Sequence, residues 1–464
     1  MQVEQTPIPG LVVVRLDVHG DSRGWFKENW QREKMMALGL PDFGPVQNNV
    51  SFNTSRGATR GIHTEPWDKF VSVANGRVFG AWVDMREGPS FGASFHVEID
   101  PSVAVFVPRG VGNSYQTLED GTAYTYLVNE HWRAGTSYPA LHLGDPAVAI
   151  PWPIPLADSE ISEKDQHNPT LDAVTPMAPK RTLITGANGQ LGRALAAAFP
   201  DAHAVGRDEL DVTDPVAVSE WPWAEYAVVL NAAAYTAVDA AETDRAAAWA
   251  GNAAAPAHLA AAAREHRLTL VHYSSDYVFD GTLDPHAEDE PYSPLGVYGQ
   301  TKAAGELAAR SAPRHYVVRT SWVVGDGPNF VRTMATLAHK GISPAVVDDQ
   351  VGRLTFTDEL ARATRHLLDQ AAPYGVYQVT GGGDPTSWYD VARTVFTACG
   401  RSADDVSTTT TEEYAAGRSM APRPLHSVLD LTKLESTGFT PRPAAESLAD
   451  YLTDYLADDL TAAR

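Results

Sequence analysis

Cysteine and basic residues are scarce in this chain of 464 residues. The single cysteine, Cys399, excludes an intrachain disulfide framework and a zinc site built from cysteines, and it is typical of a reducing compartment. The formal net charge of -22 argues against nucleic-acid binding, which requires a basic face. We therefore expect a cytoplasmic protein that holds anionic ligands through local Arg, Lys and backbone N–H groups.

A long apolar run is also missing. The alanine-rich stretch 253–263 is interrupted by Pro256 and His258 and followed by Arg264, so it predicts a helix of a soluble protein and no membrane span. The first residues show no basic region ahead of an apolar stretch, so no secretory signal is expected. The length exceeds what one hydrophobic core supports and predicts more than one domain.

The first third of the chain has the pattern of an all-β domain. Short alternating or β-branched runs recur between Gly, Pro, Asn and Asp turn signals, at the spacing typical of a sandwich or barrel. The runs are 11–16, 46–52, 70–73, 78–83, 95–99, 103–107 and 124–128. A proline-rich, polar interval follows and predicts a linker. We expect a first domain at 1–166, a linker at 167–180 and a second domain at 181–464.

From Arg181 onward, strand and helix patterns alternate. Expected strands are 182–185, 202–205, 227–232, 268–274 and 315–321, and helical patterns include 241–266, 298–310, 357–368 and 387–397. Such alternation predicts a doubly wound parallel sheet of the Rossmann type. The first expected strand and helix enclose Gly186, Gly189 and Gly192. Glycines at this spacing allow a tight turn and a close approach of the backbone to a pyrophosphate at the helix N-terminus.

A second set of residues indicates carbonyl reduction. Tyr298 and Lys302 are four residues apart and share one face of the expected helix. A neighbouring ammonium favours phenolate and lowers the pKa of a tyrosine, which can then give a proton to a carbonyl oxygen as hydride reaches the carbon. Ser275 follows an expected buried strand, where parallel sheets bind ligands, and offers a second hydroxyl to the same oxygen.

Several longer stretches of the second half stand in the order found in a known enzyme group. They are Asn231-Ala-Ala-Ala-Tyr-Thr-Ala-Val-Asp-Ala-Ala-Glu242, Arg319-Thr-Ser-Trp322, and residues 272–281, 294–306, 347–353 and 423–430. With the glycine-rich turn, they make residues 181–455 resemble the extended short-chain dehydrogenase/reductases, and within these the dTDP-4-dehydrorhamnose reductases. The resemblance implies Tyr298 as proton donor, Lys302 as its partner, and Ser275 where the family usually has Thr.

The resemblance also implies the cofactor contacts. They fall at Gly186, Gly189, Gln190, Leu191, Gly192, Asp211, Ala232, Ala233 and Ala234, and Trp322 is implied as a substrate contact. NAD-binding sites usually carry Asp or Glu after the second strand, to bind the ribose hydroxyls. Here Arg207 stands at that point and suits a 2′-phosphate, although Asp208 and Glu209 follow it. We therefore expect NADPH, with NADH as the alternative.

The first half carries its own set of motifs. Asp21-Ser-Arg-Gly-Trp-Phe-Lys-Glu28, Arg60-Gly-Ile-His63, Val83-Asp-Met-Arg86 and Ser162-Glu-Lys-Asp165 make residues 1–166 resemble the dTDP-4-dehydrorhamnose 3,5-epimerases, which have a jelly-roll, cupin-like fold. The resemblance implies His63 as the base, Asp165 as the residue that orients it, and Lys69 as the donor to the enolate oxygen, worth roughly 3–4 kcal/mol. Implied substrate contacts are Arg23, Glu28, Gln47, Asn49, Arg60, Tyr138 and Lys164.

Two positions depart from the epimerase pattern. Trp132 aligns with the tyrosine expected as proton donor, and Asn113 replaces a histidine after the Pro108 turn. An indole has no titratable proton, so epimerisation at one or both carbons is in question.

We expect a fusion of two consecutive steps of dTDP-L-rhamnose synthesis; the alternative is a catalytic reductase joined to a half that binds the sugar nucleotide or dimerises. A dTDP-sugar substrate and a homodimer or higher homo-oligomer are expected; no residue is assigned to a metal, and metal dependence stays open.

Overall fold

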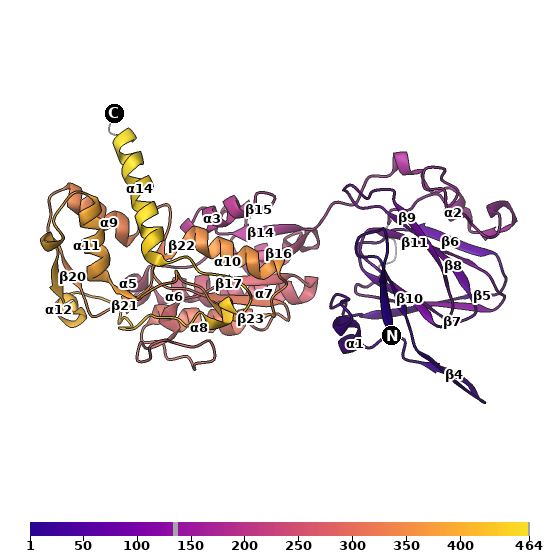
Figure 1. Ribbon diagram of the computed structural model, residues 1–464, viewed down its shortest axis with the longest axis horizontal. Helices are drawn as coiled ribbons and strands as arrows, with labels where there is room; N and C mark the ends of the chain where they lie inside the picture. Colours follow the sequence, from indigo (N-terminus) through magenta and orange to yellow (C-terminus); the bar gives the residue numbers. More distant parts are fainter. Residues whose placement is uncertain (133–137, 463–464) are drawn as a thin grey trace. The chain divides into compact units, whose positions relative to one another are not determined.

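The computed structural model describes residues 1–132 and 138–462, and it divides into two compact units, Met1–Pro179 and Lys180–Arg464 (Figure 1). No helix in the described ranges is long and apolar enough to cross a membrane. The interval 167–180, expected as a linker, belongs almost entirely to the first unit. Backbone hydrogen bonds join Met177 to Met85 and Glu87, and Leu171 donates to Asp145, so this segment is attached to the β-domain along its length.

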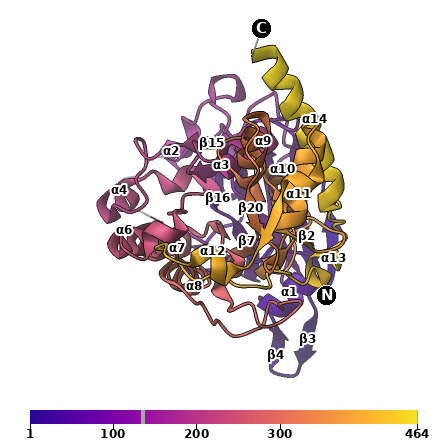
Figure 2. The ribbon, with the colours of Figure 1, turned by 90° about the vertical axis from the view of Figure 1, so that its left-hand side faces the viewer.

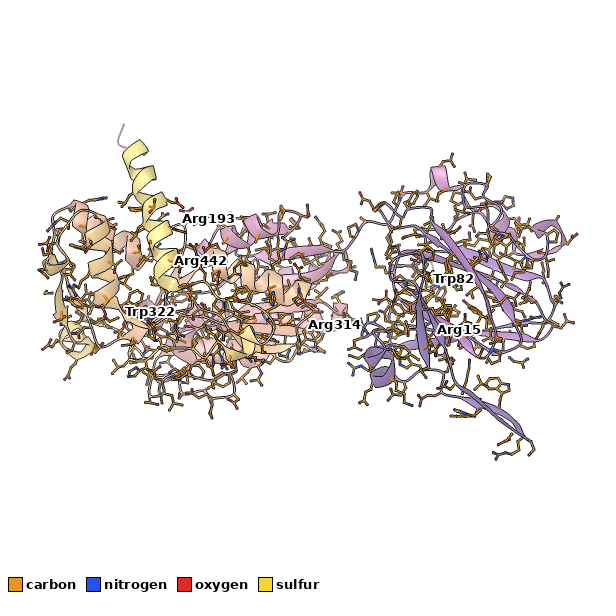
Figure 3. The ribbon with its side chains drawn as sticks, viewed as in Figure 1. Arg15, Trp82, Arg193, Arg314, Trp322 and Arg442 are labelled. Atoms are coloured by element: carbon orange, nitrogen blue, oxygen red, sulfur yellow. The ribbon has the colours of Figure 1, made fainter. Side chains whose placement is uncertain are left out.

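The first unit is a sandwich of two sheets. One sheet has the order β1 (Gln2–Gln5), β2 (Val12–Arg15), β10 (Val103–Val107), β7 (Lys69–Asn75), β12 (Thr122–Val128) and β5 (Gln47–Asn53). The other has the order β13 (Glu160–Ile161), β6 (Ala58–His63), β11 (Val111–Thr117), β8 (Val78–Asp84) and β9 (Ser94–Ile99). The core contains Val71, Val105 and the fully buried Trp82 (Figure 3). The predicted jelly-roll fold is confirmed.

A two-stranded hairpin, β3 (Val18–Asp21) and β4 (Gly24–Lys27), extends away from this sandwich (Figure 1, Figure 2). It carries the exposed side chains of Trp25 and Phe26. Two short helices complete the unit: α1 (Arg32–Ala37) and α2 (Glu163–Gln166). Ser162 is the N-cap of helix α2: its hydroxyl accepts a hydrogen bond from the backbone N–H of Asp165. This cap stabilises the helical turn that carries Asp165.

The second unit is built on a six-stranded parallel sheet. Its order is β15 (His203–Val205), β14 (Arg181–Thr185), β16 (Tyr226–Asn231), β17 (Thr269–Tyr273), β18 (His315–Arg319) and β23 (Gly375–Gln378). Successive residues of a strand face opposite sides. Leu183 and Leu270 pack with helices on one face, and Ile184 and Val271 pack with helices on the other. The predicted Rossmann-type fold is confirmed.

The helices cover both faces of this sheet. On one face lie α4 (Pro215–Glu220), α7 (Ala255–His266) and α8 (Val297–Ala309); on the other lie α3 (Gln190–Ala198), α10 (Thr357–Asp369) and α13 (Thr432–Glu435). The strand order reverses between β14 and β16. In sheets of this kind, ligands bind at the carboxyl ends of the strands at that point. The fold therefore places the glycine-rich turn, which follows β14, at the expected ligand crevice.

The helix predicted over 241–266 is not continuous. It is built from α6 (Arg245–Trp249), a π-helical turn (Ala250–Ala254) and α7, and the short α5 (Val238–Ala241) precedes it. Gly305 of α8 faces this turn so closely that a Cβ there would lie 2.0 Å from the Asn252 carbonyl oxygen. Single π-helical turns inside α-helices occur frequently at functional sites.

A smaller lobe follows the sheet. Its core joins α9 (Phe330–His339), α11 (Trp388–Ala398) and α14 (Ala444–Ala462) around Val331, Phe396 and Leu448 (Figure 2). The remaining elements are β19 (Val323–Val324), β20 (Ala345–Val347), β21 (Val351–Gly352), β22 (Thr355–Phe356), β24 (Thr386–Ser387), β25 (Ser407–Thr409) and α12 (Thr411–Ala415). This lobe supplies one wall of the crevice above the sheet.

Candidate active sites

The glycine-rich turn of the second unit tolerates no side chains at two of its positions. Gly186 has φ +70°, and a Cβ there would lie 2.6 Å from the Ala233 nitrogen. A Cβ on Gly192 would lie 2.2 Å from the Gly186 carbonyl oxygen. Helix α3 starts after Gly189 without a side-chain cap, which leaves its positive end open to an anion. The cradle fits the pyrophosphate of a dinucleotide.

Two adjoining cavities extend from this turn. The smaller, about 220 Å³, is lined by Gly186, Ala233, Arg207 and Asp211. The larger, about 690 Å³, is lined by Gln190, Leu191, Ser275, Tyr298, Lys302 and Trp322. Both include Gly189, Ala232 and Ala234 in their walls, so the two cavities are continuous. Of the cofactor residues expected from the sequence, Gly192 alone lines neither cavity, because it packs α3 against the turn.

Arg207 and Asp211 lie at the outer end of this crevice. The Arg207 side chain is exposed. The Asp211 carboxylate accepts hydrogen bonds from the Thr213 hydroxyl and N–H, which lower its pKa, and the charge of Arg207 adds to this effect. The Asp211 carboxylate is therefore already hydrogen-bonded within its own loop. The Arg207 side chain, at the same outer end of the crevice, is exposed and can rotate toward a phosphate.

The proposed catalytic residues of the second unit meet in the larger cavity. Tyr298 and Lys302 share one face of α8, and Ser275 follows β17. The Tyr298 hydroxyl is hydrogen-bonded to the Ser275 side chain. The Lys302 ammonium is buried and donates to the Tyr273 carbonyl oxygen at 2.6 Å. The structure thus brings together all three residues that the sequence singled out.

The electrostatics of Tyr298 differ from the sequence-based expectation. Burial raises the pKa of Tyr298 to about 12, and the nearby Asp276 carboxylate raises it further. Burial also lowers the pKa of Lys302 to about 8. For both residues, burial is the largest cause of the shift, and it disfavours the charged form. Tyr298 is held protonated, which suits a proton donor, and Lys302 does not make it a phenolate before ligands bind.

Sequence reasoning missed three residues in or next to this site. Asn252, in the π-helical turn, is buried and bonds Tyr235 and the Thr301 hydroxyl; its signal was a lone amide in an alanine-rich helix. Asp276 lies directly beside Ser275. Trp388 stacks on Trp322 with ring centroids 3.8 Å apart. Trp322 has φ +47°, a strained conformation for a bulky residue, and such strain is concentrated at ligand sites.

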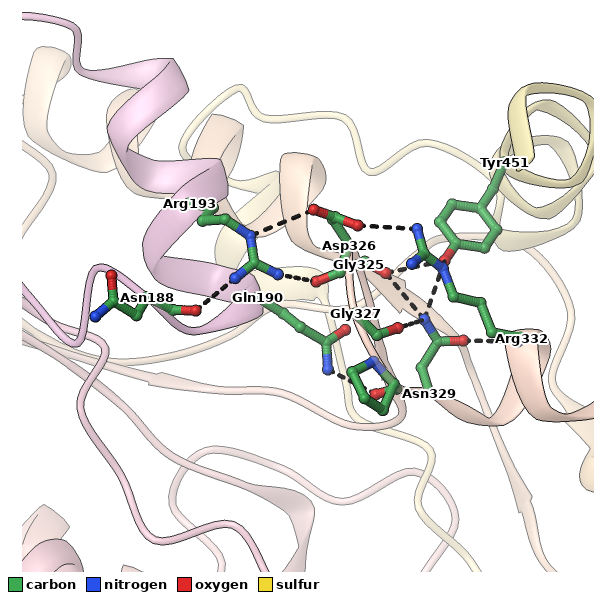
Figure 4. Close-up of polar contacts among 10 residues, drawn as sticks. Asn188, Gln190, Arg193, Gly325, Asp326, Gly327, Asn329, Arg332 and Tyr451 are labelled. Carbon is green, nitrogen blue, oxygen red and sulfur yellow. Dashed lines mark hydrogen bonds and ion pairs between the residues drawn. The ribbon is translucent and has the colours of Figure 1, made fainter. Parts of the chain in front are cut away.

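A polar network ties the glycine-rich turn to the smaller lobe (Figure 4). Arg193 of α3 donates to the carbonyl oxygens of Asn188 and Asp326, and the Gln190 amide donates to the Pro328 carbonyl oxygen at 2.9 Å. On the far side, the Tyr451 hydroxyl of α14 donates to the Gly325 carbonyl oxygen at 2.9 Å. The loop that closes the larger cavity is thus held between α3 and the last helix.

In the first unit, His63 and Asp165 form the pair expected from the sequence. His63 Nε2 lies 2.7 Å from Asp165 Oδ1, and the Gly61 N–H donates to Oδ2 at 3.2 Å. Burial opposes ionisation of Asp165, but these hydrogen bonds hold its pKa below the usual value. His63 lies opposite Asn113 in the pairing of β6 with β11. The charged carboxylate can therefore fix the ring and stabilise its protonated form.

Lys69 lies in the same unit in an unexpected pairing. Its buried ammonium contacts the Glu65 carboxylate and lies 5.9 Å from the centre of the Tyr126 ring. Burial raises the pKa of Tyr126, and the charge of Glu65 raises it further. Asn49 lies directly opposite Tyr126 in the pairing of β5 with β12. Glu65 and Tyr126 therefore join Lys69 in one polar cluster, and the sequence-based assignment of the site had left out Glu65.

The other residues predicted to bind substrate divide into two groups. Arg60 Nε donates to Asn53 at 3.1 Å, the amides of Gln47 and Asn49 are 2.8 Å apart, and Tyr138 packs edge-on against Trp67. The other three are Lys164, exposed on α2 next to Asp165; Arg23, exposed in an ion pair with Asp21; and Glu28, partly buried in an ion pair with Lys34. Arg23 lies in the turn of the projecting hairpin and Glu28 follows its second strand, and their ion pairs are formed with Asp21 and Lys34.

The two departures from the epimerase pattern have structural explanations. Trp132 is 58% exposed, and its backbone N–H donates to the Gln47 side chain at 3.2 Å. The tyrosine that lies beside Lys69 is Tyr126, on β12. Asn113 accepts hydrogen bonds from the Trp82 indole at 2.9 Å and the Tyr124 hydroxyl at 3.1 Å. Among the described residues, no cluster of three His, Cys, Asp or Glu side chains could hold a metal ion.

The fold and these sites define a protein of two enzyme-like units, a jelly roll with a His–Asp pair and a short-chain dehydrogenase/reductase with a Ser–Tyr–Lys set. The chain belongs to the family described as the RmlD substrate binding domain, whose model matches residues 180–457. Residues 5–173 match the family dTDP-4-dehydrorhamnose 3,5-epimerase. Both resemblances expected from the sequence are confirmed.

Individual relatives agree with this division. A protein of Streptococcus pyogenes described as an RmlC homolog is 47% identical over 180 residues, which are 37% of this chain and 90% of that protein. A probable dTDP-4,6-dihydroxy-2-methyloxan-3-one 4-ketoreductase of Streptomyces antibioticus is 43% identical over 288 residues, 60% of this chain and 96% of that protein. The crystal structure of a dTDP-4-dehydrorhamnose reductase from Bacillus anthracis in complex with NADP is 31% identical, covers 60% of this chain and 99% of its own, and has a TM-score of 0.55.

Proposed function

We propose that this chain catalyses two consecutive steps of dTDP-L-rhamnose formation. The first unit epimerises dTDP-4-keto-6-deoxyglucose at C3 and C5, and the second reduces the resulting dTDP-4-dehydrorhamnose at C4 with NADPH. The observation that carries this proposal is that each unit holds a candidate set of proton-transfer residues: a base, His63, paired with Asp165 in one, and Tyr298 with Ser275 and Lys302 in the other. Epimerase and reductase relatives of matching extent support it.

In the first unit, His63 takes the proton alpha to the C4 ketone. Its Nε2 is bonded to Asp165, so Nδ1 is the ring nitrogen left to accept that proton. The resulting imidazolium is stabilised by the Asp165 carboxylate, whose pKa is lowered. Lys69 donates to the enolate oxygen, and the ion pair with Glu65 holds its buried side chain in place.

Reprotonation from the opposite face requires an acid, and the structure favours Tyr126 for this role over Trp132 or His131. Tyr126 is half-buried beside Lys69, whereas Trp132 and His131 are exposed. Burial and Glu65 hold the pKa of Tyr126 above its usual value, so the phenol carries its proton at neutral pH. The indole of Trp132 therefore does not deprive this unit of an acid.

Tyr126→Phe is expected to separate the two half-reactions. Deprotonation by His63 should continue, because none of its partners is touched, but inversion should fall by about 10²-fold, the worth of a positioned acid. Proton NMR in D2O with dTDP-4-keto-6-deoxyglucose measures both exchange and inversion. Trp132→Phe is the matched control and should behave as wild type. Loss of inversion in Trp132→Phe, with Tyr126→Phe unaffected, would transfer the role to residue 132.

In the second unit, the glycine cradle and the uncapped N-terminus of α3 fit the cofactor pyrophosphate, and NADPH bound there would supply the hydride for C4. Tyr298 gives its proton to the C4 oxygen, and Ser275 lies within hydrogen-bonding reach of the Tyr298 hydroxyl. Lys302 is fixed by the Tyr273 carbonyl oxygen and stabilises the phenolate that this transfer leaves behind. Trp322 and Trp388 form an aromatic wall for the sugar nucleotide.

Arg207 is proposed to select NADPH through its 2′-phosphate. The Arg207→Ala variant loses a charge-assisted contact worth roughly 1.5–3 kcal/mol, so its preference for NADPH over NADH should fall about tenfold or more. The ratio of kcat/KM for the two cofactors measures this, and NADH serves as the internal control because it lacks the phosphate. An equal loss with both cofactors would show that Arg207 does not contact the 2′-phosphate.

Two further expectations from the sequence stay predictions. A homodimer or higher homo-oligomer and a cytoplasmic location agree with the use of a soluble sugar nucleotide and NADPH. Sedimentation of the purified chain would establish the oligomeric state.

A further inference from the structure

A buried carboxyl group lies directly behind the proposed proton donor of the second unit. Asp276 is 2% exposed, and its backbone N–H donates to the Thr320 carbonyl oxygen at 2.9 Å. In the described part of the chain, no Lys, Arg or His forms an ion pair with it. The Oδ2 atom of Asp276 is buried and has no hydrogen-bond partner of good geometry among the described residues. The Ser427 side chain lies near the same carboxyl group and lowers its pKa. A charge buried in this way is costly, and such groups tend to take up a proton.

The remaining oxygen of Asp276 controls the hydroxyl of Ser275. Ser275 Oγ donates to Asp276 Oδ1 at 2.9 Å, and it accepts a hydrogen bond from the Tyr277 N–H at 3.2 Å. A serine hydroxyl has one proton. While the carboxylate of Asp276 accepts that proton, Ser275 has none to donate to a substrate oxygen and can serve Tyr298 only as an acceptor.

A protonated Asp276 reverses this direction. Its O–H then donates to Ser275 Oγ, and the Ser275 proton is released toward the cavity, where the carbonyl oxygen of a substrate would lie. Burial raises the pKa of Asp276 to about 6, against the opposing hydrogen bonds of Ser427 and Ser275 and the charge of His286. The other titratable groups that face it are Tyr277 and Tyr298, both phenols. An anionic cofactor and sugar nucleotide would disfavour the carboxylate further.

We propose that Asp276 is a positioning residue for the reduction: its protonated form directs the Ser275 hydroxyl to the substrate carbonyl oxygen, and its ionised form withdraws it. This inference rests on the proposed reductase function of the second unit. It assigns Asp276 an action through Ser275, beside which Asp276 lines the larger cavity. The proposal also explains why no basic side chain of the described residues pairs with the Asp276 carboxyl group. A permanent ion pair would keep Asp276 ionised, and it could then not donate to Ser275.

The pH dependence of reduction tests this proposal. With dTDP-4-dehydrorhamnose and saturating NADPH, kcat/KM is measured between pH 5.5 and 7.5, below the titration of Lys302. The wild type should lose about twofold to tenfold as the pH rises through 6 or above, the worth of one neutral hydrogen bond. Asp276→Asn should show no such change and stay at the low-pH rate, because its amide donates to Ser275 at every pH. Ser427→Ala removes a hydrogen bond to the carboxylate and should move the wild-type midpoint upward.

The contrary results are equally definite. A flat wild-type profile, or a midpoint that survives unchanged in Asp276→Asn, would overturn the proposal. So would a large loss of activity in Asp276→Asn at every pH while NADPH binding is retained, because the ionised form would then be the active one.

A second measurement does not depend on turnover. The carboxyl carbons of aspartate are labelled with ¹³C in the full chain, and the Asp276 signal is identified by its absence in Asp276→Asn. Its chemical shift should titrate well above the ordinary aspartate range, and a midpoint at or below 4 would refute the proposal. If the wild type reduces no dTDP-4-dehydrorhamnose, the proposed function fails, and this titration still decides whether Asp276 holds a proton.

Discussion

Tyr298→Phe is expected to lower NADPH-dependent reduction of dTDP-4-dehydrorhamnose by about 10²–10⁴-fold, the usual worth of a general acid. The substitution removes only the hydroxyl that is bonded to Ser275 and keeps the ring, which packs edge-on against Tyr277. Because the pKa of Tyr298 is raised to about 12 by burial, the phenol carries its proton at neutral pH and can donate it. Oxidation of NADPH, followed by its absorbance, measures the rate.

Two controls distinguish a lost acid from a damaged site. NADPH affinity should survive in Tyr298→Phe, since the glycine turn and Lys302 are unchanged, and fluorescence of the bound nicotinamide would report it. Tyr277→Phe removes a neighbouring buried phenol that is not bonded to Ser275, and it should retain activity within about tenfold. A near wild-type rate in Tyr298→Phe would remove this tyrosine from the mechanism.

His63→Asn is expected to lower epimerisation by a similar factor, about 10²–10⁴-fold. Asparagine preserves much of the volume and a polar contact to Asp165 but offers no basic nitrogen. Solvent-deuterium exchange at the sugar carbons, followed by NMR, should fall together with inversion, since both depend on deprotonation. This differs from Tyr126→Phe, which should retain exchange.

The second unit supplies the control for this variant. Reduction of preformed dTDP-4-dehydrorhamnose by full-length His63→Asn should match the wild type, because the substitution lies in a separate compact unit. If exchange and inversion continue undiminished in His63→Asn, His63 is not the base. The alternative, in which the first unit only binds the sugar nucleotide or dimerises, predicts that the wild type itself catalyses no exchange.

Much of the reductase site could be predicted because its signals are local. Gly192 is required by a contact within the turn, Gly186 has a positive φ there, and Tyr298 and Lys302 share a helix face through their spacing. The direction of the Tyr298 pKa shift could not be predicted, because it depends on how deeply the fold buries the phenol and on the carboxylate of Asp276. Asn252 was missed because a lone amide in an alanine-rich stretch does not by itself indicate a π-helical turn.

The epimerase site depends on long-range pairing, so less of it follows from sequence. His63 and Asp165 are 102 residues apart in the chain, and only the resemblance to a family linked them. The position of Tyr126, which we propose as the acid, depends on strand register, since β12 pairs with β7 and brings the Tyr126 ring near Lys69. The interval 167–180 looked like a linker because prolines and polar residues also occur where a segment packs through backbone hydrogen bonds.

Identification of the sugar formed by the full-length chain tests the central claim most directly. The purified protein is incubated with dTDP-4-keto-6-deoxyglucose and NADPH, and the product is identified by NMR. We predict dTDP-L-rhamnose, inverted at C3 and C5 and reduced at C4, and no L-rhamnose product from His63→Asn. A reduced sugar that retains the D configuration, or identical products from wild type and His63→Asn, would contradict the proposal that both units are catalytic.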